Sequence, residues 1–382
     1  MRAAVLCDVR RFEIRDVPRP DPSPRDVVMR VAAVGLCGTD FHIYDGRGNY
    51  NTDRSGRPIP LSRAPQILGH ENAGIVEEIG REVRDLKPGD AVIVDQGINC
   101  VSAGRQALCE YCASGDSHQC EFYQEHGLTG LPGGMADYLI IPAVNCVRYD
   151  AGVPHAEAAL VEPLACIVHT MEAGQRARGR YHLVPRRGEA RAMSVFIAGA
   201  GPAGLLFLQY LRRALSYEGH VFVSEPNPAR RALAASFGAD VIDPTAVDVV
   251  QTILDRTNGR RVEWLIDASG TGALFRDIPL LIRKQATIVL YAHGQTDVEL
   301  SVINHLQFRE PTLVATAGGS GGFDSDGRPA VYRRALALVE DGTIEVSRFI
   351  THRYCSLDQV PEAFGGPDRR SPDYIKAVLE LD

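Results

Sequence analysis

The stretch Val195-Phe196-Ile197-Ala198-Gly199-Ala200-Gly201-Pro202-Ala203-Gly204 decides the fold of this chain. Its first four residues form a short apolar run that is typical of a buried strand. Its last six match the pattern G-x-G-x-x-G, and the helical pattern of residues 205–215 follows directly. Alone, the pattern is weak evidence. Between a strand and a helix, it predicts a loop that binds the pyrophosphate of a dinucleotide.

The glycines of this loop each have an expected role. Gly199 allows the tight turn, Gly201 lets the backbone approach the pyrophosphate, and Gly204 allows the helix to pack closely on the strand. The helix N-terminus then offers free N–H groups and a partial positive charge to the phosphates. We therefore expect Gly199, Gly201, Pro202 and Gly204 to bind the cofactor.

Glu225 lies 21 residues after Gly204, where the second expected strand ends. A carboxylate there can accept hydrogen bonds from the adenosine ribose, and it would repel a 2′-phosphate, which favours NAD over NADP. Arg230 and Arg231 follow closely and weaken this preference, and Arg230 is a further candidate for cofactor binding. The alternative is that Glu225 is an ordinary exposed carboxylate.

The pattern of short strands changes along the chain. Before about residue 190 the β-rich runs are separated by turns, as in an all-β or barrel-like domain. After it, strands and helices alternate, which predicts a doubly wound parallel sheet. The expected strands are 1–5, 27–34, 74–79, 90–94, 195–198, 221–223, 241–242, 264–266 and 287–291, and the expected helices are 205–215, 227–237 and 330–340.

Length and composition limit the function classes. A chain of 382 residues is expected to form two domains. Its net charge of −7 argues against a nucleic-acid binder. The most apolar window, 193–211, is interrupted by glycine and proline, so we expect no membrane span, no secretory signal and a cytoplasmic protein. The Arg- and Gly-rich segment 175–191 is expected to be a solvated loop, with phosphate binding as the alternative.

Two groups of residues are candidate metal ligands. Cys109, Cys112 and Cys120 lie within twelve residues, which in a cytoplasmic chain indicates a structural zinc site with Cys100 as the expected fourth ligand. Free thiols in a loop are the alternative. The second group is dispersed, and spacing alone does not join its members, which are Cys37, His70, Glu71 and Glu162.

The order of these motifs resembles that of the zinc-containing medium-chain alcohol dehydrogenases, and is most similar to the polyol (sorbitol-type) and threonine dehydrogenase branch. The resemblance extends through almost the whole chain. It is carried by Cys37-Gly38-Thr39-Asp40, Gly69-His70-Glu71-x2-Gly74-x5-Gly80, the cysteine loop, Glu162-Pro163, Gly199-x-Gly201-x2-Gly204 and Gln359-Val360-Pro361-Glu362-Ala363-Phe364.

The resemblance implies an α/β fold in which a GroES-like, β-rich catalytic domain from both ends of the chain encloses an inserted Rossmann domain. The expected boundaries are 1–167, 168–308 and 309–382. It also implies NAD, one structural zinc and one catalytic zinc in the cleft between the domains. Cys37 and His70 match the usual catalytic ligands, Glu71 matches the polyol-branch ligand, and Glu162 takes the third-ligand position. Glu71 and Glu162 can both act as ligands of the catalytic zinc, one bound directly and the other bound through a water molecule or by exchanging with the first.

The implied reaction is hydride transfer from an alcohol carbon to NAD, with zinc as the Lewis acid. Thr39 is expected to accept the substrate proton, and His42 resembles the surface end of the family's proton relay. A structural hydroxyl and a surface histidine are the alternatives. A polyol, sugar or cyclitol is the first expectation for the substrate, and threonine or another amino alcohol is the second. A homodimer or homotetramer is expected.

Rival functions and departures from the family remain open. The rivals are a zinc-free quinone reductase and a non-catalytic NAD-binding protein on the same fold.

The cysteine loop departs from the family pattern. Cys100 and Cys109 are nine residues apart where the family has three, and Gln106 stands where the first cysteine would fall, so the identity of the fourth structural ligand is open. Segment 44–66 is longer than usual, polar, and expected to cover the substrate.

Overall fold

The computed structural model describes residues 1–294, 296, 298–299 and 301–381, which form two compact units. The first unit comprises Met1–Cys166 and Gly318–Asp382, and the second comprises Ile167–Ala317. The sequence places the end of the inserted domain at 308. In the structure the second unit continues to Ala317, because a further strand, β18 (Thr312–Ala315), pairs with its sheet.

The first unit is built on a seven-stranded sheet with the order β10-β6-β5-β3-β20-β19, in which β9 also pairs with β3. Its longest strand, β3 (Asp26–Gly35), is almost fully buried because it is flanked on both sides. The other strands of this sheet are β5 (Glu71–Ile79), β6 (Ala91–Val94), β9 (Tyr138–Pro142), β10 (Cys146–Arg148), β19 (Ile350–Tyr354) and β20 (Lys376–Glu380).

Both ends of the chain therefore contribute to one sheet, since β20 pairs antiparallel with β3 through Val378 and Gly35. A smaller sheet has the order β2-β1-β4, and β7 pairs with β8. The remaining elements of this unit are β1 (Arg2–Asp8), β2 (Arg11–Asp16), α1 (Gly38–Tyr44), β4 (Gln66–Ile67), β7 (Gly97–Ile98), α2 (Glu110–Ser114), β8 (Gln124–Glu125), α3 (His155–Ala159), α10 (Ala330–Glu340) and α11 (Val360–Gly365).

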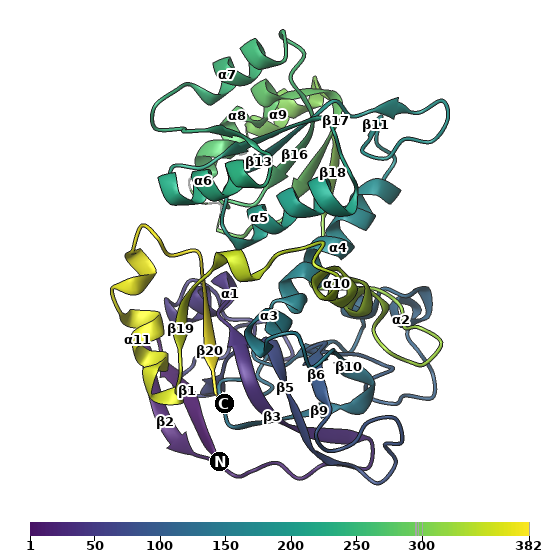
Figure 1. Cartoon of the computed structure of the whole chain (residues 1–382), viewed down its shortest axis with the longest axis vertical. Coiled ribbons are helices and arrows are strands. Elements are labelled where there is room, and N and C mark those ends of the chain that lie inside the picture. Colours follow the sequence, from purple (N-terminus) through teal and green to yellow (C-terminus); the bar gives the residue numbers. More distant parts are fainter. Residues whose placement is uncertain (295, 297, 300, 382) are drawn as a thin grey trace. The chain divides into compact units, whose positions relative to one another are not determined.

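The second unit contains a six-stranded parallel sheet with the order β15-β14-β13-β16-β17-β18, and helices lie on both faces of it (Figure 1). This is the doubly wound sheet that the sequence predicts. Its strands are β13 (Ser194–Ala198), β14 (His220–Ser224), β15 (Asp240–Ile242), β16 (Val262–Asp267), β17 (Ile282–Leu290) and β18. Its helices are α5 (Pro202–Gln209), α6 (Pro228–Ser236), α7 (Val249–Arg256), α8 (Gly272–Leu281) and α9 (Val302–Gln307).

The segment 175–191 is more ordered than the expected loop. Helix α4 (Val161–Arg176), which begins in the first unit, extends into it, and β11 (Tyr181–His182) pairs parallel with β12 (Ala190–Arg191). The indole N–H of Trp264 donates to the carbonyl of Tyr181, which attaches this segment to the sheet. No helix in the described part of the chain is both long and apolar enough to cross a membrane.

Candidate active site

Cys37, His70 and Glu71 come together in the first unit, with one ligand atom from each within 4.8 Å of the others. Cys37 is the N-cap of α1 and lies two residues after the end of β3, while Glu71 begins β5. The pairing of Gly35 with Glu71 across β3 and β5 brings these two segments together. A thiolate, an imidazole and a carboxylate are the ligand types of catalytic zinc sites, so these residues fit the metal.

Asp40 orients two of these ligands. Its fully buried carboxylate accepts hydrogen bonds from the backbone N–H of Cys37, at 3.0 Å, and of Gly69, at 3.4 Å. It also faces Nδ1 of His70 at 3.4 Å, which leaves the other ring nitrogen for a metal. Burial alone would lower the pKa of His70, but the charges of Asp40 and Cys37 outweigh it and raise that pKa. The sequence motif contained Asp40, but its supporting role emerged only from the structure.

Lys376 is a buried neighbour of Glu71 that sequence reasoning missed. Its buried ammonium lies 2.6 Å from the Glu71 carboxylate and donates to the carbonyl of Leu36 at 2.9 Å. Burial would lower the pKa of Lys376, but the Glu71 charge outweighs it and raises that pKa. Glu71 therefore already has a cationic partner, and a metal would have to share its carboxylate with Lys376.

Glu162 stands apart from the group of three. It lies on α4, is 6% exposed, and accepts hydrogen bonds from Nε2 of Gln96, at 2.8 Å, and from the thiol of Cys166, at 3.3 Å. Burial raises its pKa to about 7, although the charge of His70 opposes the rise and the charge of Glu71 adds to it. Glu162 is not among the three residues whose ligand atoms lie within 4.8 Å of one another, although the charges of His70 and Glu71 influence its pKa.

Further polar groups lie near the candidate metal ligands. The hydroxyl of Thr39 lies 3.7 Å from the sulfur of Cys37. Tyr50, from the segment 44–66, is 38% exposed; its partial burial raises the pKa of its phenol, and the charges of Cys37 and Glu125 add to the effect. Gln96 also donates to Glu125 at 3.0 Å. His42, in the last turn of α1, is partly exposed.

The four cysteines form a second group. Cys100, Cys109, Cys112 and Cys120 each place their sulfur within 4.8 Å of the others. The sulfur of Cys120 lies 3.6 Å from that of Cys100 and 3.8 Å from that of Cys109. A tetrahedron with Zn–S bonds of about 2.3 Å has S···S edges of about 3.8 Å. These residues therefore fit a zinc ion, with Cys100 beside the other three despite its unusual spacing.

The environments of these thiols differ. Backbone N–H groups, first that of Cys112 and then that of Glu121, lower the pKa of Cys109 to about 6. Burial raises the pKa of Cys112 instead. Cys109 is the N-cap of α2, where free N–H groups favour an anion. The loop thus holds at least one ready thiolate, as a thiolate metal site requires.

The glycine-rich loop has the backbone that a dinucleotide site needs. Gly199 has a φ of +93°, and a Cβ on Gly204 would lie 2.0 Å from the carbonyl oxygen of Gly199. Pro202 begins α5 directly after Gly201. The loop follows β13 at the carboxyl edge of the parallel sheet, where open α/β sheets bind their ligands.

Glu225 is buried rather than exposed, and it supports this loop. Its carboxylate accepts the backbone N–H of Ala200 at 2.8 Å and that of Asn227 at 2.9 Å. The amide oxygen of Asn227 caps α6 by accepting the N–H of Arg230. Glu225 therefore joins the ends of β13 and β14, and its remaining lone pairs are available to a ribose.

Comparison with protein families identifies both units. Residues 23–151 match the alcohol dehydrogenase GroES-like domain, and residues 202–341 match the zinc-binding dehydrogenase domain. An L-threonine 3-dehydrogenase of Pyrococcus horikoshii is 32% identical over 92% of this chain and 90% of its own. The chain belongs to the zinc-containing medium-chain alcohol dehydrogenases. Zinc and NAD(P) are typical of this family, which confirms the expected fold, enzyme class and cofactor types.

Other relatives show the range of the family. The L-galactonate-5-dehydrogenase of Escherichia coli is 27% identical over 88% of this chain and 86% of its own. A solved zinc-binding dehydrogenase from Sinorhizobium meliloti, bound to NADP, is 29% identical with a TM-score of 0.79 and covers 100% of this chain and 99% of its own. These similarities agree with a zinc-dependent alcohol oxidoreductase, and they fit either a polyol or threonine as the substrate.

Proposed function

We propose that this enzyme oxidises a secondary alcohol that carries neighbouring hydroxyl groups, such as a polyol, sugar or cyclitol, with NAD as the hydride acceptor. The observation that carries the proposal is the group Cys37–His70–Glu71. Glu162, a buried carboxyl whose pKa is influenced by the charges of His70 and Glu71, is the second candidate carboxylate. Cys37 and His70 would hold the catalytic zinc with Glu71 or Glu162. Bound zinc supplies a Lewis acid for the substrate oxygen.

The chain's own residues supply the remaining chemistry. Thr39 would accept the proton of the substrate hydroxyl and pass it toward His42. Asp40 keeps His70 oriented, and Lys376 holds Glu71 in place. Tyr50, Gln96 and the neighbouring carboxylates offer donors and acceptors for additional hydroxyl groups. This surplus of polar groups supports a hydroxyl-rich substrate over a simple apolar alcohol.

Glu225 supports NAD as the cofactor. Its carboxylate sits at the end of β14, beside the glycine-rich loop, where it would repel the additional phosphate of NADP. The relative from Sinorhizobium meliloti was solved with NADP, so the choice between the two cofactors needs its own measurement.

L-threonine is the second candidate substrate. Several relatives at 30–32% identity are L-threonine 3-dehydrogenases. The carboxylates of Glu125 and Glu162 would suit the ammonium group of an amino alcohol. The L-galactonate-5-dehydrogenase relative, in contrast, supports a sugar-derived substrate.

A substrate panel tests both candidates. Purified zinc-loaded enzyme is mixed with NAD and one polyol, sugar acid, cyclitol or amino alcohol at a time, and NADH absorbance is followed. We expect the highest kcat/KM for a compound with vicinal hydroxyls. Activity confined to threonine would select the second candidate. Full activity after selective removal of the catalytic zinc would contradict both.

We also propose that the protein forms a homodimer or homotetramer. β18 is the end strand of the second unit's sheet and exposes 53% of Leu313. An unpaired, apolar strand edge favours pairing with a second copy. Light scattering after size-exclusion chromatography should give a multiple of the 41.6 kDa chain mass.

A further inference from the structure

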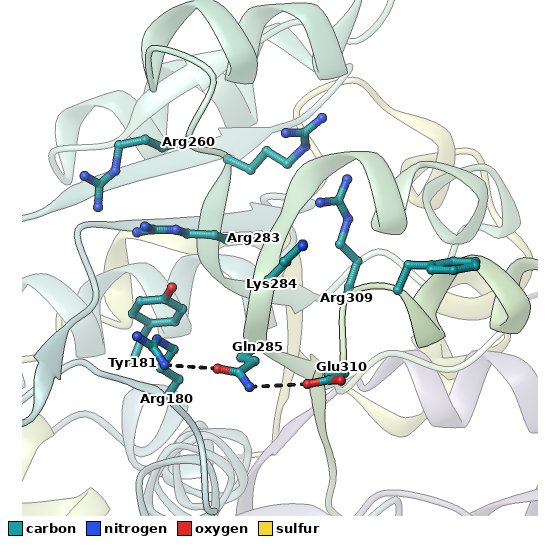
Figure 2. A pocket seen from close by; sticks show the side chains of 10 residues that line it. Arg180, Tyr181, Arg260, Arg283, Lys284, Gln285, Arg309 and Glu310 are labelled. Atoms are coloured by element: carbon teal, nitrogen blue, oxygen red, sulfur yellow. Dashed lines mark hydrogen bonds between the residues drawn. The ribbon is translucent and has the colours of Figure 1, made fainter.

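A strongly basic pocket opens in the second unit. It has a volume of about 520 Å³ and is lined by six cationic side chains, together with Tyr181, Gln285, Phe308 and Glu310. Figure 2 shows Lys284 between Arg283 and Arg309 in this pocket. The six cations are Arg180, Arg260, Arg261, Arg283, Lys284 and Arg309.

The pocket is separate from the glycine-rich loop. Arg260 and Arg261 directly precede β16, and Arg283 and Lys284 lie at the start of β17. Gly199 instead follows the last residue of β13, which is parallel to β16. The pocket thus lies at the amino-terminal edge of the sheet, whereas the dinucleotide loop lies at the carboxyl edge.

The positive charge of this pocket is a local feature. The whole chain carries a net charge of −7, yet six cations line this pocket against one lining carboxylate, Glu310. Glu263 beneath it pairs with Arg283 at 2.9 Å and lies 3.7 Å from Arg260. Two carboxylates cannot balance six cations, so the pocket keeps an excess of positive charge.

The surroundings of two of the cations agree with this excess. The side chain of Lys284 is exposed, and no other described residue forms a hydrogen bond or ion pair with its ammonium. Burial lowers the pKa of Arg309, and the nearby positive charge of Arg261 adds to the effect. Like charges held this close repel one another, and a bound anion would relieve that repulsion.

The backbone at the pocket is also unusual. Arg261, Gln285 and Glu310 all line it and have positive φ angles of 67°, 60° and 47°. Residues other than glycine adopt such angles at a cost, and they cluster at functional sites. Hydrogen bonds hold Gln285 between Arg180, at 3.2 Å, and Glu310, at 3.3 Å, so the wall of the pocket is preformed.

We propose that this pocket binds an anion with two or more linked phosphate groups. Guanidinium groups present planar forks of N–H donors that match phosphate oxygens, and five of the six cations are arginines. The cations belong to the residue before β11, the segment before β16, the start of β17 and the segment after α9. Because they are spread around the pocket, a chain of phosphates would contact more of them than a single phosphate.

Calorimetry of the full-length, zinc-loaded enzyme tests this proposal. NAD is kept saturating so that the dinucleotide loop is filled, and inorganic triphosphate and ATP are titrated separately without magnesium. We expect binding of at least one of them that weakens as salt is raised. Equal affinities would indicate recognition of the phosphates alone, and tighter ATP binding would indicate a nucleotide; both results support the oligophosphate site.

Charge reversal locates the binding. Arg180 and Lys284 are exposed, so the double variant Arg180→Glu, Lys284→Glu should fold normally and lose affinity about 10-fold or more. The matched control is Arg81→Glu, Arg370→Glu, which reverses two exposed cations of the first unit. It should bind as the unmodified enzyme does. The proposal is overturned if the unmodified enzyme binds neither anion at about 0.15 M salt, if both variants bind equally, or if the pocket variant changes oligomeric mass instead of affinity.

Discussion

Thr39 is the residue on which the proposed proton transfer depends. Its hydroxyl lies 3.7 Å from the sulfur of Cys37, but Thr39 is not one of the three candidate metal ligands. Because α1 begins at Gly38, the side chain is fixed by the same turn that presents Cys37. A substitution that removes only the hydroxyl can therefore separate proton transfer from metal binding.

Thr39→Val should leave zinc content and NAD affinity unchanged and lower kcat by about 10²–10⁴-fold, the usual contribution of a general acid–base group. Thr39→Ser keeps a hydroxyl and should recover most of the activity. Stopped-flow measurement of NADH formation checks both variants. A Val variant with normal kcat would show that the hydroxyl carries no proton.

Glu225 combines two roles that sequence alone could not separate. Its carboxylate holds Ala200 and Asn227, and it also places a negative charge beside the expected ribose. Glu225→Gln keeps an acceptor oxygen but removes the charge, so the ratio of kcat/KM for NADP to that for NAD should rise. Glu225→Ser loses the support of the loop as well, and should raise KM for both cofactors. If the unmodified enzyme uses NAD and NADP equally, the electrostatic explanation fails.

At the scale of elements, the cysteine loop is held by very little regular structure. Between Cys100 and Cys120 the described helical elements are the five-residue α2 and a three-residue 3-10 helix, Ser117–Gln119. Cys112→Ser should therefore reduce zinc to one ion per chain and lower the melting temperature, because structural zinc contributes directly to folding. Turnover per zinc-loaded, folded molecule should fall much less. Elemental analysis with calorimetry measures both, and an unchanged melting temperature would argue against a structural metal.

Elements also show what sequence could and could not predict. Buried runs of β-branched residues located β13, β14 and β16, and Gly238 located the end of α6, because these signals are local. β18 has only four residues and was missed. β17 starts at Ile282, before its expected start at 287. Its first residues include Arg283, Lys284 and Gln285, which line the basic pocket, and these polar side chains interrupt the apolar pattern that predicts a buried strand.

The candidate site was predictable only in part, for a related reason. The resemblance named Cys37, His70 and Glu71, but their proximity depends on the register of β3 with β5. Lys376 could not have been inferred from spacing, since the pairing of β20 with β3 brings it to Glu71 across 305 positions of sequence. The hydrophobic pattern of a strand indicates which of its faces is buried, but it does not say which distant strand will pair with it.

At the scale of the whole molecule, the pair formed by Glu71 and Lys376 joins the two ends of the first unit at the proposed zinc site. Both side chains are almost fully buried, and the ammonium lies 2.6 Å from the carboxylate. Once the catalytic zinc has been removed, Lys376→Met should leave the Glu71 charge without a cationic partner and lower the free energy of unfolding by about 3–5 kcal/mol. Lys376→Met with Glu71→Gln removes both charges and should recover much of that loss. Urea unfolding of the unmodified enzyme, the two single variants Lys376→Met and Glu71→Gln, and the double variant provides the test. The zinc content of each protein is measured before the catalytic zinc is removed. If Glu71 is the direct zinc ligand, Lys376→Met should keep its zinc and the double variant should lose affinity for it, whereas equal zinc content in both would assign the carboxylate ligand to Glu162. Purely additive losses of stability in the cycle would show that the two charges do not support each other.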